Sequence, residues 1–164
     1  MQQSPREHAN VMVIDASPGF RALVVDVLRT MGVKQITQAG EIAQALEVLP
    51  RVMPNVILLD WAINDAVGIE FVKRLRRGAA GVRRDTPVIM VTSRKDLGDV
   101  EAARAAGVDE YLIKPVSTAN LTARIDAVLF KRREFIQSAN FVGPARRRRR
   151  VDIGNGDRRS KNTA

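Results

Sequence analysis

Apolar residues over positions 1–130 fall into short continuous runs, and each run is followed by a segment with apolar residues at helical spacing. The runs lack the alternation expected of a strand with one wet face, so they are typical of strands covered on both faces of a sheet. The predicted strands are Val11–Ile14, a weaker one at about Lys34–Gln38, Asn55–Leu59, Pro87–Val91 and Glu110–Ile113.

Helix signals separate these strands. Ser17-Pro18 offers an N-cap followed by proline at the first helical position, and Gly32 ends that helix. Ser117 caps the last helix, which continues to about Arg133. The other predicted helices cover about 41–49, ended by Pro50, then 69–78, and 96–106, closed by Gly107. Strict alternation of five strands and five helices predicts an α/β fold with a doubly wound parallel sheet.

Polar residues stand directly after four of the predicted strands. Asp15 follows the first, Asp60 the third, Thr92 the fourth and Lys114 the fifth. In an open parallel sheet these positions meet at one edge, and ligands bind there. We therefore expect two carboxylates, a hydroxyl and an ammonium group to converge.

This set of groups fits a divalent cation and a phosphoryl group. Mg²⁺ takes one or two protein carboxylates and completes its shell with water and phosphate oxygens. A lysine supplies a point charge for phosphate, and an aspartate can form an aspartyl-phosphate. Each residue alone has a simpler interpretation as a turn former, a helix cap or a loop residue. Their joint placement at one edge of the sheet favours a site for a metal ion and a phosphoryl group.

Four segments of the chain resemble the receiver domain of bacterial two-component response regulators. They are Val11–Pro18, Asn55–Gly68, Pro87–Ser93 and Gly107–Pro115, in the order and spacing of that family. The resemblance covers about residues 9–133 and implies a flavodoxin-like (β/α)5 receiver fold. It also implies a stand-alone, single-domain signalling module that modifies itself and is not a turnover enzyme.

The resemblance gives each strand-end residue an expected role. Asp60 matches the aspartate that accepts a phosphoryl group from a histidine kinase or phosphotransfer protein, with Lys114 as the lysine before proline. Thr92 matches the hydroxyl residue that moves toward the phosphoryl group, and Tyr111 the aromatic residue that turns inward behind it. This repacking is expected to change the surface formed by residues 96–133, where a downstream protein target would bind.

The expected Mg²⁺ ligands are Asp15, Asp60 and the backbone carbonyl of Ala62. The family normally carries an acidic pair after the first strand, but this chain has Ala16 as the second member, which should weaken the metal site. Asn64 also stands where proline is common. A second hypothesis is therefore a pseudo-receiver that acts as an interaction module without phosphate.

A third class, a flavodoxin-like cofactor binder, shares this architecture. It is disfavoured because the first strand–helix turn has no glycine-rich or hydroxyl-rich phosphate loop. The zero cysteines exclude disulfides and thiolate metal sites, and the single histidine, His8, excludes multi-histidine clusters. No apolar run reaches the roughly 20 residues of a membrane span, and Asp15 interrupts the first run too early for a signal peptide, so we expect a cytoplasmic protein.

The net charge of +9 is concentrated at the C-terminal end. Residues 1–130 hold 16 Lys/Arg and 15 Asp/Glu, whereas residues 131–164 hold 11 and 3. The segment 134–164 lacks periodicity and contains Phe141–Pro144 followed by Arg146–Arg150, which resembles tails of some stand-alone receivers. We expect a disordered basic tail without a DNA-reading domain. It is either simply solvated or in contact with an acidic protein surface, nucleic acid or an anionic membrane.

Overall fold

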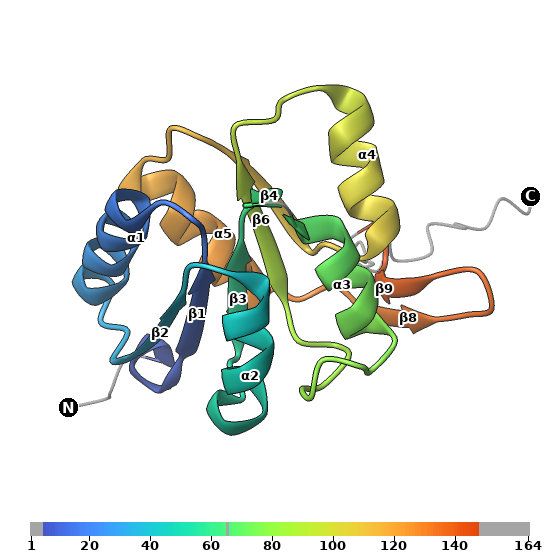
Figure 1. The fold of residues 1–164 in the computed structure, drawn as a ribbon, viewed down its shortest axis with the longest axis horizontal. Helices are drawn as coiled ribbons and strands as arrows, with labels where there is room; N and C mark the ends of the chain where they lie inside the picture. The colour runs from blue at the N-terminus through green and yellow to red at the C-terminus, as the bar shows by residue number, and fades with distance from the viewer. Residues whose placement is uncertain (1–4, 65, 148–164) are drawn as a thin grey trace, which may run out of the picture.

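Figure 1 shows the computed structural model, which describes residues 5–64 and 66–147. Its central feature is a five-stranded, fully parallel sheet in the order β2-β1-β3-β6-β7. The strands are β1 (Asn10–Ile14), β2 (Gln35–Ala39), β3 (Val56–Leu59), β6 (Val88–Thr92) and β7 (Glu110–Ile113). The predicted doubly wound parallel sheet is confirmed.

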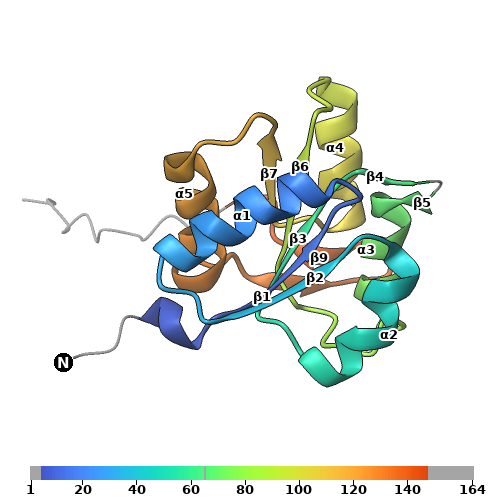
Figure 2. The same cartoon turned by 60° about the vertical axis from the view of Figure 1, so that its left-hand side comes forward.

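Helices cover both faces of this sheet (Figures 1 and 2). The helices are α1 (Pro18–Thr30), α2 (Ile42–Val52), α3 (Gly68–Arg76), α4 (Leu97–Ala106) and α5 (Thr118–Phe130), preceded by a short 3-10 helix, η1 (Pro5–His8). One core layer lies between the sheet and α2, α3 and α4, and the other between the sheet and α1 and α5. Within the described residues, no helix is long and apolar enough to cross a membrane.

Local capping explains where several helices begin and end. The Ser17 hydroxyl accepts a hydrogen bond from the Phe20 backbone N–H at 3.2 Å, and the Ser117 hydroxyl accepts one from Asn120 N–H at 3.1 Å. Gly107 ends α4 with φ of 103°, a left-handed conformation that favours glycine. These predicted caps are confirmed.

Three details differ from the sequence predictions. Helix α2 does not end at Pro50 but continues to Val52, since a proline in the last turn disrupts only one late hydrogen bond and Met53 then closes the helix in the left-handed region. Helix α5 ends at Phe130 rather than Arg133. Between β3 and α3 lies a short antiparallel hairpin of β4 (Ala62–Ile63) and β5 (Ala66–Val67), which the apolar pattern did not predict.

The largest difference concerns the segment after α5. Residues expected to form a disordered tail from position 134 instead pair as an antiparallel hairpin of β8 (Phe135–Gln137) and β9 (Val142–Pro144). Figure 1 shows this hairpin beside α3 and below α4. The prediction is wrong for these residues, and the rest of the basic segment, 148–164, lies outside the described residues.

A buried arginine explains why this hairpin is ordered. Arg76, at the end of α3, is only 2% exposed and donates to the carbonyls of Gly107, Arg84 and Thr86 at 2.7–2.9 Å. It also pairs with the buried Asp109 carboxylate at 2.8 Å. Burial raises the pKa of Asp109, and the Arg76 guanidinium is the strongest influence that lowers it.

The hairpin closes over this ion pair. The Phe135 ring lies 5.5 Å from the Arg76 guanidinium carbon, in cation–π geometry. A Cβ on Gly143 would lie 2.7 Å from the Gly107 Cα, so only glycine allows the two backbones to approach this closely. The hairpin therefore forms a lid over the amino-terminal edge of the sheet.

Replacing Arg76 tests this arrangement. We expect Arg76→Ala to lower the free energy of unfolding by about 3–5 kcal/mol, because Asp109 would remain buried without its partner. The control Arg77→Ala removes an exposed neighbouring arginine and should change it by less than about 0.5 kcal/mol. Urea denaturation measures both, and equal effects of the two substitutions would contradict the assignment.

Candidate functional site

The carboxyl-terminal edge of the sheet brings two aspartates and one lysine together. Asp15 follows β1, Asp60 follows the adjacent β3, and Lys114 follows β7. The Lys114 ammonium donates to Asp15 Oδ2 at 2.7 Å and to Asp60 Oδ2 at 3.2 Å. One cation is thus shared between two carboxylates that would otherwise repel each other.

Asp15 is held firmly in this cluster. Its side chain is only 4% exposed, and its second oxygen accepts from the Ser17 backbone N–H at 2.8 Å. Arg21, on the first turn of α1, donates to the Asp15 backbone carbonyl. These contacts fix the Asp15 carboxylate at the base of the site, beside Lys114.

Asp60 is more open to solvent. Its side chain is 17% exposed, and its Oδ1 accepts from the Trp61 backbone N–H at 2.6 Å. Gly68 packs directly against this turn, because a Cβ there would lie 2.3 Å from the Asp60 carbonyl oxygen. Any side chain at position 68 would therefore clash with the backbone of Asp60, the more accessible of the two carboxylates.

The hairpin after Asp60 determines the position of the Ala62 carbonyl and the backbone conformation of Asn64. Gly68 N–H donates to the Trp61 carbonyl, so the next pair, Ala62 and Val67, is a non-hydrogen-bonded pair. The Ala62 carbonyl therefore makes no hydrogen bond to the partner strand. Asn64 has φ of 55°, which proline cannot adopt because its ring fixes φ near −65°. The proline that is common at this position therefore does not fit the turn that this chain forms.

Thr92 and Tyr111 lie next to the charged cluster without joining it. Thr92 is the last residue of β6, the strand between β3 and β7, and its buried hydroxyl accepts from Arg94 N–H at 3.3 Å. The half-buried Tyr111 donates its hydroxyl proton to the Arg94 carbonyl at 2.8 Å. Burial and the nearby carboxylates of Asp99 and Asp60 raise the pKa of Tyr111, so it remains a donor.

Arg94 is a site residue that the sequence reasoning missed. Its guanidinium carbon lies 5.0 Å from the centroid of the Trp61 ring, and it pairs with Asp99 on α4 at 3.3 Å. The residue thereby links the segment after Asp60 to α4. No spacing in the sequence signals such a stacking contact between two loops.

An apolar groove adjoins the charged cluster at Lys114. It has a volume of about 360 Å³ and is lined by Phe20, Leu23, Ser93, Lys114, Pro115 and Val116. The Lys114 ammonium lies 4.0 Å from the centroid of the Phe20 ring. The peptide bond between Lys114 and Pro115 is cis.

The oxygen donors of the cluster fit a magnesium ion, although they are few. Asp15, Asp60 and the Ala62 carbonyl provide hard oxygen ligands, and Mg²⁺ needs only one or two protein carboxylates besides water and phosphate. Ala16 is half-buried against the apolar core and contributes no ligand. Within the described part of the chain, no group of three or more His, Cys, Asp or Glu residues is arranged to hold a metal.

A family model identifies this arrangement. The model of the response regulator receiver domain matches residues 11–126. These include the whole sheet apart from Asn10 and all five helices apart from the last four residues of α5. The chain belongs to this family. Receiver domains are the phosphorylation-dependent signalling modules of two-component systems rather than classical enzymes.

Individual proteins agree with this assignment. The chain is 34% identical over 119 residues to the phosphate regulon transcriptional regulatory protein PhoB of Escherichia coli, covering 73% of this chain and 51% of PhoB. It is 32% identical over 119 residues to the DNA-binding response regulator MtrA of Mycolicibacterium smegmatis, covering 73% and 50%. This receiver thus spans about half the length of the curated relatives it matches.

Solved structures share the fold. The chemotaxis protein CheY4 of Vibrio cholerae superposes with a TM-score of 0.67 at 26% identity, covering 73% of this chain and 98% of CheY4. The receiver domain of the sensor histidine kinase PA1611 of Pseudomonas aeruginosa, which holds a magnesium ion in its active-site cleft, gives 0.65 at 24% identity, covering 74% and 97%.

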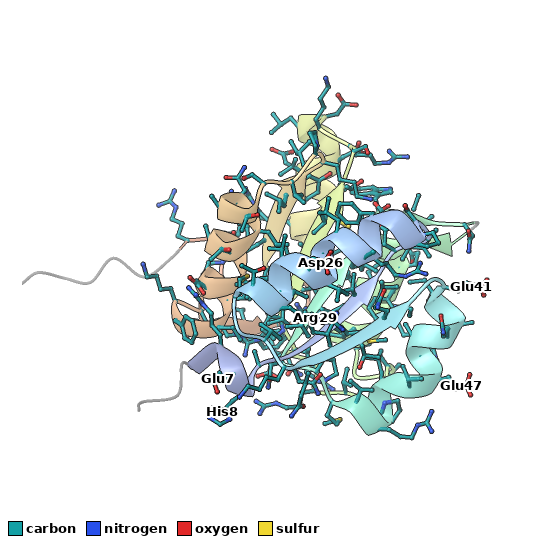
Figure 3. The ribbon with its side chains drawn as sticks, turned by 90° about the vertical axis from the view of Figure 1, so that its left-hand side faces the viewer. Glu7, His8, Asp26, Arg29, Glu41 and Glu47 are labelled. Atoms are coloured by element: carbon teal, nitrogen blue, oxygen red, sulfur yellow. The ribbon has the colours of Figure 1, made fainter. Side chains whose placement is uncertain are left out.

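Titration with Mg²⁺ tests the donor set of this receiver. Trp61 is the only tryptophan and its backbone N–H bonds to Asp60, so metal binding should change its fluorescence. We expect Ala16→Asp to tighten Mg²⁺ binding by about tenfold, because it adds a carboxylate ligand. Asp15→Asn should weaken binding by a similar factor. The control Asp26→Asn, on the exposed face of α1 (Figure 3), should leave it unchanged, and no effect of Ala16→Asp would contradict the ligand assignment.

Proposed function

We propose that this receiver accepts a phosphoryl group on Asp60 from a histidine kinase or a phosphotransfer protein. The observation that carries the proposal is the Lys114 ammonium shared between Asp15 and Asp60, with Asp60 the more exposed carboxylate. A donor needs access to one oxygen of the acceptor and a positive charge beside it. Only Asp60 combines the two within this cluster.

The reaction is a displacement at phosphorus. A carboxylate oxygen of Asp60 forms a bond to phosphorus, while the bond between phosphorus and the donor's imidazole nitrogen breaks and its electron pair stays on the nitrogen. Lys114 stabilises the negative charge on the phosphoryl oxygens, and Asp15 holds Lys114 in place. Bound Mg²⁺, held by Asp15, Asp60 and the Ala62 carbonyl, would supply further positive charge for these oxygens.

The added charge then biases a two-state element. Thr92 ends β6, the strand between those that precede Asp60 and Lys114, and we expect its hydroxyl to donate to a phosphoryl oxygen. Its movement would break the contact with Arg94 N–H and give Tyr111 space to turn inward. We propose that the output is the surface formed by α4, β7 and α5, which corresponds to residues 96–133, and that it is recognised by a downstream protein.

Replacing the acceptor tests this function. Asp60→Asn should abolish incorporation of acid-labile phosphate from acetyl phosphate in the presence of Mg²⁺, because an amide is not a nucleophile here. Intact-mass spectrometry measures the incorporation. The matched control Asp26→Asn removes an exposed aspartate on α1 and should incorporate phosphate like the unchanged protein. Equal incorporation in Asp60→Asn would remove Asp60 from the mechanism.

The second candidate, a phosphate-independent interaction module, is favoured by one observation. Ala16 replaces a carboxylate with a methyl group that packs against the core, so the metal site has one ligand fewer than the family pattern. If the unchanged protein takes up no phosphate but Ala16→Asp does, the chain is a pseudo-receiver that lost its metal chemistry at this position.

A further inference from the structure

We propose that the groove between α4, β7 and α5 binds an extended acidic peptide segment of a partner protein. This inference rests on the proposed output surface and names the chemistry of its partner. The groove has a volume of about 660 Å³ and follows β7, which is an edge strand of the sheet. An extended segment is the shape that fits beside an exposed strand edge.

Arginines from three parts of the chain line this groove. Arg104 comes from α4, Arg124 from α5, and Arg133 and Arg146 from the segment after α5. The acidic groups in the lining already have partners: Asp109 pairs with Arg76, and Glu110 pairs with Arg124 at 2.9 Å. The charge left to recognise a partner is therefore positive.

Two of these arginines are available for binding. Arg104 and Arg146 are exposed, and their side chains make no hydrogen bond or ion pair within residues 5–64 and 66–147. Arg133, in contrast, is engaged in structure, because it donates to the carbonyls of Asp109 and Ala145. These contacts place the chain just before Arg146 at the groove, and Arg147–Arg150 follow directly in the sequence.

The shape of the site favours a peptide over nucleic acid. A DNA duplex presents its phosphates on a convex surface and is read by elements that protrude into its grooves, whereas these arginines line a hollow. Single-stranded nucleic acid needs exposed aromatic platforms for stacking. Tyr111 is the only aromatic residue in the lining, and its hydroxyl is bonded to the Arg94 carbonyl.

The groove also connects the proposed switch to the basic segment. Ile113 ends β7 beside Lys114, and the Tyr111 side chain reaches the Arg94 carbonyl in the loop after β6. Arg133 and Arg146 line the groove near Asp109, before the start of the strand. A peptide along β7 would contact both. Its affinity should therefore respond to phosphorylation, although the arginines themselves do not take part in phosphoryl transfer.

Charge reversal in the groove tests the inference on the full chain. The probe is a fluorescein-labelled peptide of alternating Asp and Glu, and binding is followed by fluorescence anisotropy. We expect the double variant R104E/R146E to weaken binding by at least about tenfold. The control R29E/R51E reverses two exposed arginines on α1 and α2 and should bind within about twofold of the unchanged protein.

Parallel measurements separate the possible failures. A single- or double-stranded oligonucleotide that binds more tightly than the peptide, with the same loss in R104E/R146E, would overturn the peptide assignment. Equal losses of peptide binding in R104E/R146E and R29E/R51E would overturn the assignment of the groove as the binding site. Because R104E/R146E keeps Asp60 and Lys114, it should still take up phosphate from acetyl phosphate. If the unchanged protein binds the peptide but takes up no phosphate, the groove remains supported as a peptide-binding site and the proposed phosphoryl transfer is refuted.

Discussion

The Lys114 ammonium held between Asp15 and Asp60 is the interaction on which the proposed function of this fold depends. Asp15 and Asp60 follow adjacent strands, so the sheet forces two negative charges together. Lys114 follows β7, two strands away from β3, and its long side chain must cross the end of β6 to reach them. Thr92 stands at that crossing point. The order of the strands thus places carboxylates, an ammonium group and a hydroxyl around one small space.

The two edges of the sheet have opposite characters. At the carboxyl-terminal edge Asp60 and Lys114 remain partly open, as the proposed phosphoryl transfer requires. At the amino-terminal edge Arg76 and Asp109 are buried and covered by the β8–β9 hairpin. The same hairpin leads the chain to Arg146 at the α4–β7–α5 groove. The hairpin that stabilises the amino-terminal edge therefore also leads basic residues to the proposed output surface.

Much of the fold could be predicted because its signals are local. Continuous apolar runs such as Val11–Ile14 and Val88–Thr92 identify buried strands, and Ser17 and Ser117 cap the helices that follow. Asp15, Asp60 and Lys114 directly follow strands and Thr92 ends one, so the topology alone made the cluster predictable. The role of each residue in phosphoryl transfer remains a prediction.

The missed features depend on contacts between residues far apart in the sequence. The β8–β9 hairpin has no amphipathic pattern, because it is held by Gly107 and by the ring of Phe135 over Arg76. An arginine at the end of α3 looks like a surface residue until the carbonyls around it are known. Arg94 likewise meets Trp61 only after both loops are folded.

The central claim is that a covalent charge on Asp60 repacks Tyr111, and fluorine NMR tests it most directly. Tyr111 is the only tyrosine, so 3-fluorotyrosine gives one resonance for the chain. With acetyl phosphate and Mg²⁺, we expect a second resonance whose intensity follows the phosphorylated fraction found by mass spectrometry, and no second resonance in Asp60→Asn. A single unchanged resonance in protein that carries phosphate on Asp60 would contradict the account.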